Sequence, residues 1–145
     1  MIQNILVPYE GSPLSKKALD LGKEIALNFN ATLNILMIIS PYYPISDSIY
    51  TNAMANQKIV KELATQGERD LSQVTKKCND EGVKAFYKIV HDDVSNAILK
   101  ESKKNKTDLI IMGSRRLKGL AAIKRFGSTA RHVSEHATCP VTIVH

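Results

Sequence analysis

Short runs of consecutive apolar residues, each ending at a turn, restrict the fold of this chain more than any other feature. Ile5, Leu6 and Val7 form the first run, and residues 109–112 form another that ends at Gly113. Strands buried on both faces of a parallel sheet show such runs, whereas half-exposed strands alternate. The chain is therefore predicted to contain a sheet covered by helices on both faces.

Amphipathic segments separate the apolar runs. After the turn 9–11, Ser12 is placed to cap a helix and Pro13 occupies its first position, where a missing N–H costs nothing. Its apolar stripe has helical spacing: Leu14, Ala18, Leu21 and Ile25. Further helices are predicted over 57–81, after the turn 91–93, where an Asp can cap, and from Gly127 to about residue 136.

Strands are predicted at 2–8, 33–39, 83–90, 109–112 and 140–144, and the alternation in the third places it near an edge. Strands alternating with helices imply a parallel sheet with right-handed crossovers. In such sheets, ligands bind beyond the carboxyl ends of the strands. The turns at that edge are predicted at 9–12, from 40 onward, at 91–93 and at 113–128.

The 145 residues fit one domain, 1–145, and no apolar run reaches the roughly 20 residues that span a bilayer. The amino-terminal sequence does not resemble a signal peptide, so a cytoplasmic protein is expected. Cys78 and Cys139 lack metal-site spacing and are expected to be free thiols. Residues 40–56 contain two prolines, which exclude a helix or a central strand there. This long connection is expected to be either a flap over a site or a surface that binds a partner.

The formal charge of +6 is concentrated near the carboxyl-terminal end. Between positions 114 and 131 there is no Asp or Glu, but there are six basic residues: Arg115, Arg116, Lys118, Lys124, Arg125 and Arg131. Either this is a solvated loop, or Gly113, the basic side chains and the helix start at Gly127 and Ser128 bind an anion.

Other candidate groups leave alternatives open. Glu10 either bonds the hydroxyls of a ribose or is a solvated turn residue. His132 and His136 have metal-compatible spacing, but no third ligand is visible, which favours a surface pair. No set of residues for nucleophilic catalysis can be assembled, and the basic loop lacks the interleaved aromatics of an RNA-binding surface.

Together these motifs make the chain resemble the universal stress protein family over essentially its whole length. The resemblance rests on ILVPYEGSPLSKKALDLG, HDDVSNAI, TDLIIMGSRR and FGSTARHVSEHATCPVTIV. It implies an α/β fold of the Rossmann-like, adenine nucleotide alpha hydrolase-like type, with a five-stranded parallel sheet in strand order 3-2-1-4-5. It also implies a homodimer that forms through the last strand, Val141–Val144.

One branch of that family binds ATP through Gly-x-x-Gly, nine further residues and Gly-Ser or Gly-Thr. Gly113 matches the first glycine, and Gly127 with Ser128 matches the final pair. Arg116 stands where the second glycine belongs, and ten residues rather than nine separate it from Gly127. Glu10 replaces the Asp that meets the ribose in ATP-binding members.

The resemblance implies a stress-response binding module that takes ATP with Mg²⁺ and is not expected to be an enzyme. The alternatives are a dimer of the non-ATP branch, a slow ATPase-type switch and, more weakly, an RNA-binding protein. The implied nucleotide site, with Ile38 under the adenine, comprises Pro8, Tyr9, Glu10, Ile38, Met112, Gly113, Arg115, Arg116, Gly127, Ser128 and Thr129.

Overall fold

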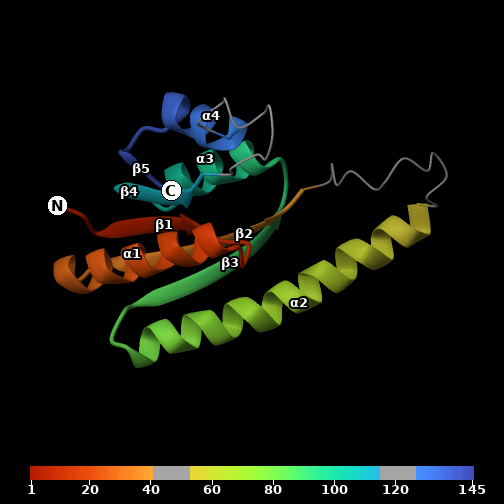
Figure 1. The fold of residues 1–145 in the computed structure, drawn as a ribbon, viewed down its shortest axis with the longest axis horizontal. Helices are drawn as coiled ribbons and strands as arrows, with labels where there is room; N and C mark the ends of the chain where they lie inside the picture. The colour runs from red at the N-terminus through yellow and green to blue at the C-terminus, as the bar shows by residue number, and fades with distance from the viewer. Residues whose placement is uncertain (41–52, 115–126) are drawn as a thin grey trace.

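The chain folds around one five-stranded parallel sheet. A computed structural model describes residues 1–40, 53–114 and 127–145, with the backbone alone for 53–56. The strands lie in the order β3-β2-β1-β4-β5, and every neighbouring pair is parallel (Figure 1). The predicted strand order is confirmed, and so is the edge position of the third strand.

The described elements alternate along the chain as the apolar pattern predicts. The strands are β1 Asn4–Pro8, β2 Thr32–Ile39, β3 Ala85–His91, β4 Leu109–Gly113 and β5 Val141–Val144. The helices are α1 Pro13–Phe29, α2 Ala53–Asp80, α3 Val94–Lys104 and α4 Ser128–His136.

Two apolar clusters sandwich the sheet. On one face, α1 and α2 pack against Ile5, Val7, Leu33 and Ile111, all of which are essentially buried. On the other face, α3 and α4 cover a second cluster that includes Leu6, Leu36, Ile98, Ile110 and Val133. Alternate residues of one strand enter opposite clusters, as the pleat requires. Below, these are called the α1/α2 face and the α3/α4 face.

The first helix begins as its sequence predicts. Ser12 caps it by accepting the Ser15 N–H at 3.2 Å, and Pro13 is the first helical residue. The helix ends at Asn30, which adopts a left-handed conformation with φ 54°. Its middle lies close to the sheet, since a Cβ at Gly22 would lie 3.0 Å from a Val7 methyl group.

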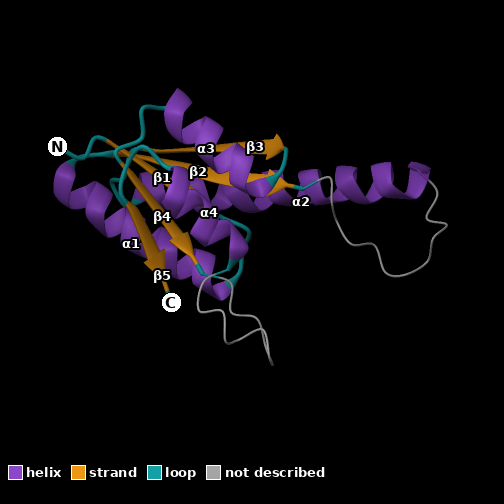
Figure 2. Ribbon diagram, turned by 90° about the horizontal axis from the view of Figure 1, so that it is seen from above, coloured by secondary structure: helices purple, strands orange, loops and turns teal. Residues whose placement is uncertain are grey.

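The long helix α2 starts earlier than predicted. The prediction that the irregular connection runs to residue 56 was wrong for 53–56, which are helical. The two prolines, Pro41 and Pro44, precede the helix start, so their effect on helix formation does not reach residue 53. Figure 2 shows α2 running well past the strands. Residues 41–52, the core of the predicted flap, lie outside the described residues.

None of the described helices combines the length and the apolar character that crossing a bilayer requires. Neither described cysteine is in a disulfide, as predicted: Cys78 is buried against α1 and the sheet, and Cys139 is partly buried.

Candidate functional site

The carboxyl edge of the sheet is where the chain places its chemically useful groups. Two of the turns that leave this edge run directly into helix starts, from β1 into α1 and from β3 into α3, and α4 also starts at this edge. Strand order reverses at β1, because β2 lies on one side of it and β4 on the other. Ligands of open parallel sheets bind at such a switch point. Those predicted site residues that the structure describes lie near this edge.

Two predicted apolar residues, Ile38 and Met112, share the α3/α4 face at this edge, and Pro8 lies at the end of β1 nearby. Pro8 ends β1, and Ile38 and Met112 both belong to the cluster beneath α3 and α4. Met112 is only 5% exposed, so its side chain lies beneath the candidate site and offers little surface to a ligand. Ile38 is partly buried and lies beside Val90 of β3.

Backbone groups of Ile38 extend beyond the end of β1. The Leu36 carbonyl accepts the Tyr9 N–H at 2.8 Å, so residues two apart on β2 direct their backbone groups towards β1. Ile38 is the next such residue, and β1 has ended there. Among the described residues, its N–H and carbonyl have no backbone partner on that side. Together they offer one hydrogen-bond donor and one acceptor, a combination that the edge of a purine base also presents.

The Tyr9 side chain does not face this region. It is 6% exposed and packs in the cluster beneath α1 and α2. Burial and the nearby carboxylates Asp70 and Asp20 raise its pKa above the ordinary value. Tyr9 can therefore offer only its backbone to a ligand on the α3/α4 face.

Glu10 and Ser12 form a pair in the turn between β1 and α1. The Ser12 hydroxyl donates to Glu10 Oε1 at 2.6 Å, and Gly11 between them adopts φ 83°. The sequence predicted Ser12 as a helix cap but missed its contact with Glu10. The signal was present, since an acid two residues before a capping serine places a carboxylate within reach of the hydroxyl.

Gly113 is needed for close packing rather than for an unusual backbone conformation. Its φ is not positive. Instead, a Cβ at this position would lie 2.8 Å from Leu14 Cβ and 3.1 Å from the Leu14 carbonyl carbon. Glycine lets the start of α1 pack directly on the end of β4.

The start of α4 lies at the same edge, and no side chain of the described residues caps it. Gly127 is the N-cap residue, with φ −59° and ψ 149°, and its carbonyl accepts the Arg131 N–H at 3.1 Å. Ser128 is exposed and Thr129 is partly exposed. The first N–H groups of a helix have no intrahelical partner, and the helix dipole adds positive potential there. This start can accept an anion.

Ser114, which the sequence did not single out, anchors the residue after Gly113. It is 1% exposed; its N–H donates to the Val144 carbonyl at 3.0 Å, and its Oγ lies 3.1 Å from His145 Nδ1. Arg115 and Arg116 lie outside the described residues, as does the rest of the basic loop up to 126. Arg131, the last basic residue of that series, pairs with Glu135 at 3.0 Å.

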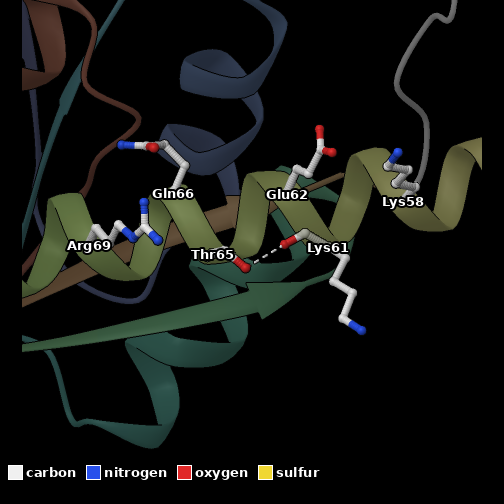
Figure 3. Close-up of a pocket in the computed structure, with 6 residues that line it drawn as sticks. All are labelled: Lys58, Lys61, Glu62, Thr65, Gln66 and Arg69. Atoms are coloured by element: carbon white, nitrogen blue, oxygen red, sulfur yellow. Dashed lines mark hydrogen bonds between the residues drawn. The ribbon is translucent and has the colours of Figure 1, made fainter.

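Two other features do not resemble a built site. A hollow along α2 is lined by exposed residues of that one helix, whose side chains diverge (Figure 3): Lys58, Lys61, Glu62, Thr65, Gln66 and Arg69. His132 and His136 stack with ring centroids 4.2 Å apart. Within the described residues, no cluster of three or more potential metal ligands occurs.

The chain belongs to the universal stress protein family, whose sequence pattern matches residues 1–145. It is 30% identical to Universal stress protein YxiE of Bacillus subtilis (strain 168) over 148 aligned residues, which cover 99% of both chains.

Solved structures show the same fold. Universal stress protein UspA from Lactobacillus plantarum superposes with a TM-score of 0.80 at 21% identity, covering 99% of this chain and 98% of that one. An Arabidopsis thaliana member with AMP bound gives a TM-score of 0.69 at 20% identity, with coverage of 98% and 90%. An Archaeoglobus fulgidus member in complex with dAMP gives 0.62 at 19%, with coverage of 100% of both chains.

Proposed function

We propose that this universal stress protein binds an adenine nucleotide at the carboxyl edge of its sheet and acts as a binding and regulatory module. The base would lie on the α3/α4 face near Ile38, the ribose near Glu10, and the phosphates at the start of α4. Relatives of the same fold bind AMP and dAMP. ATP with Mg²⁺ is the ligand that we expect here.

The uncapped start of α4 is the observation that carries this proposal. Gly127 supplies no side chain to the first turn, yet the helix begins at the switch-point edge beside the exposed Ser128 hydroxyl. A phosphate there would accept hydrogen bonds from the first N–H groups of the helix, a role that a side chain has at many other helix starts. The base contact has independent support in the Ile38 N–H and carbonyl, which have no backbone partner on the β1 side within the described part of the chain.

Titration with a fluorescent ATP analogue, with and without Mg²⁺, tests the proposal. We expect saturable binding that unlabelled ATP displaces. Both Ser128→Ala and Gly127→Val should weaken it, the first by removing a donor and the second by placing a branched side chain where the phosphate approaches. Ser134→Ala is the matched control, because its hydroxyl donates to the Ala130 carbonyl away from the helix start.

Absence of saturation at millimolar nucleotide would instead favour the dimeric, non-ATP branch of the family. Binding that Ser128→Ala and Gly127→Val leave unchanged would mean that the phosphates lie elsewhere. We do not propose an enzyme, because the described residues at this edge offer no group that is positioned as a general base. Repeated turnover of ATP in a phosphate-release assay would contradict that view.

The module is also proposed to be a homodimer that forms through β5. This strand pairs with β4 on one side only among the described strands, and Val141, Thr142 and Ile143 are each partly exposed. The Pro140 and Val144 carbonyls accept bonds from the β4 side. By alternation, the backbone groups of Val141 and Ile143 point to the free edge. A second copy could pair there or pack across it.

Val141→Pro tests that interface. Proline removes the outward N–H at the first residue of an edge strand, a place where the fold tolerates it. Val141→Ala keeps the N–H and serves as the control. Light scattering coupled to size exclusion should show a dimer for wild type and for Val141→Ala, and a monomer for Val141→Pro. A stable dimer of Val141→Pro would place the interface elsewhere.

A further inference from the structure

The turn between β1 and α1 links a carboxylate to the helix cap through one hydroxyl group. The chain reverses at Gly11, whose φ of 83° is left-handed, and so brings the Ser12 hydroxyl back to Glu10. Ser12 Oγ and Glu10 Oε1 lie 2.6 Å apart. This is a short hydrogen bond of the kind that forms to a charged acceptor.

The direction of this hydrogen bond follows from the other partner of Ser12. The Ser15 N–H donates to Ser12 Oγ at 3.2 Å, so the hydroxyl is the acceptor there. A carboxylate can only accept, so the hydroxyl proton must lie between Ser12 and Glu10. The Ser12 oxygen therefore caps the helix as an acceptor and binds Glu10 as a donor. A substitution can remove the donated hydrogen bond and keep the accepted one.

Glu10 keeps one oxygen available. Oε1 accepts from Ser12, and in the described part of the chain Oε2 has no hydrogen-bond partner. Glu10 is exposed at the strand end beside the proposed ribose position. A free glutamate side chain samples many rotamers, and its carboxylate reaches one methylene further than that of aspartate. The bond to Ser12 draws the carboxylate back against the turn.

We propose that Ser12 is a positioning residue that holds Glu10 Oε2 to accept a ribose hydroxyl, so that the site selects nucleotides with an intact ribose. This inference rests on the proposed nucleotide function. A ligand that lacks the hydroxyl would lose this hydrogen bond to a charged acceptor, and its affinity would fall accordingly. The relative in complex with dAMP accepts a nucleotide without the 2′-hydroxyl, so this selectivity is not a property of the fold.

Three substitutions at position 12 separate donation from capping. Ser12→Asp keeps a good helix cap but cannot donate, and its charge repels Glu10. Ser12→Thr keeps both roles. Ser12→Ala loses both. Ser15→Ala is the control in the same turn, because its hydroxyl donates to the Ser12 carbonyl at 3.0 Å and has no bond to Glu10.

The measurement is the ratio of the dissociation constants of 2′,3′-dideoxy-ATP and ATP, determined by competition. Because both ligands carry the same phosphates, the ratio cancels the repulsion that Ser12→Asp adds. We expect wild type, Ser12→Thr and Ser15→Ala to favour ATP by about tenfold, the value of one hydrogen bond to a charged group. Ser12→Asp and Ser12→Ala should bring the ratio to about one to threefold.

Each contrary outcome has a distinct meaning. If wild type binds ATP selectively and Ser12→Asp and Ser12→Ala keep the full ratio, Ser12 does not position Glu10 and the proposal fails while the nucleotide function stands. A wild-type ratio of one overturns it in the same way. If wild type binds neither ligand, the proposed function fails and this inference fails with it.

Discussion

The starts of α1 and α4 lie at the same edge of one sheet and are built in opposite ways. At α1, Ser12 caps the helix, Pro13 occupies the first position, and Leu14 packs on Gly113. At α4, the N-cap residue is Gly127, and among the residues that the structure describes no side chain caps the first turn. The start of α3 resembles that of α1, because Asp93 accepts the Asn96 N–H at 3.1 Å.

This difference distinguishes helix starts that the chain caps with its own side chains from one that has room for a ligand. At the starts of α1 and α3, a side chain of the cap residue accepts one of the first helix N–H groups, from Ser15 and from Asn96. The start of α4 leaves that role to water or to an anion. A helix whose cap is missing at a switch point is therefore a better guide to the ligand than the presence of polar residues nearby.

Gly113→Val should have the largest effect on stability. The added branched side chain would clash with the Leu14 backbone, which cannot move without displacing the start of α1. We expect the free energy of unfolding in urea to fall by about 3 kcal/mol. Gly113→Ala should cost less. Should Gly113→Val unfold like wild type, the packing of α1 on β4 would be looser than described.

Removal of the two side-chain caps should have the second largest effect on stability. Ser12→Ala and Asp93→Ala should each lower the free energy of unfolding by about 1 kcal/mol, because each leaves a helix N–H without its partner. Ser128→Ala, at the uncapped helix, should change stability by less than about 0.5 kcal/mol. Equal losses at all three positions would remove the contrast between the helix starts.

Gly127→Asp would give α4 the cap that α1 already has. The φ of −59° suits any residue, so we expect a gain of a few tenths of a kcal/mol, about the difference between glycine and a good cap. Nucleotide affinity should fall at the same time, since the carboxylate would occupy the phosphate position. A variant that became more stable and bound ATP as wild type does would separate α4 from the ligand.

The smallest effect should be a pH dependence at the turn before α3. The hydrogen bond from Lys100 at 2.9 Å, followed by that from the Asp93 N–H, lowers the pKa of Asp92. A lowered pKa in the folded state stabilises the protein above the ordinary pKa of about 4, and this contribution is lost as the pH falls through the lowered value. The stability gap between wild type and Asp92→Asn should therefore narrow below about pH 4.

Lys100→Met should shrink the same gap, because it removes the main cause of the pKa shift. Urea denaturation of the single and double variants at pH 7 and pH 3 measures both effects. A gap that is equal at the two pH values would show that Asp92 does not titrate differently in the folded and unfolded protein.

Much of the fold was predictable because it depends on local chemistry. Apolar runs such as Ile5 to Val7 have no stable place except a sheet covered on both faces, and Ser12 with Pro13 fixes a helix start within one turn. Helix and strand alternation then leaves few topologies. The start of α2 was missed because the proline restriction was extended too far along the chain.

The candidate site was predictable in position but not in the role of each residue. Glu10, Ile38 and the start of α4 lie at the expected edge. Tyr9 belongs to the opposite face, because the pleat turns neighbouring side chains in opposite directions and a large aromatic ring is stabilised by burial beneath α1 and α2. Arg115 and Arg116 remain predictions outside the described residues.

By itself, the sequence determined the family, the order of the elements and the edge at which the candidate site is expected, since each depends on residues close together along the chain. Only the tertiary structure decided why Gly113 is a glycine and which backbone groups of Ile38 have no backbone partner among the described residues. Both depend on contacts between elements, namely how α1 packs on β4 and where β1 ends beside β2, which no local pattern specifies.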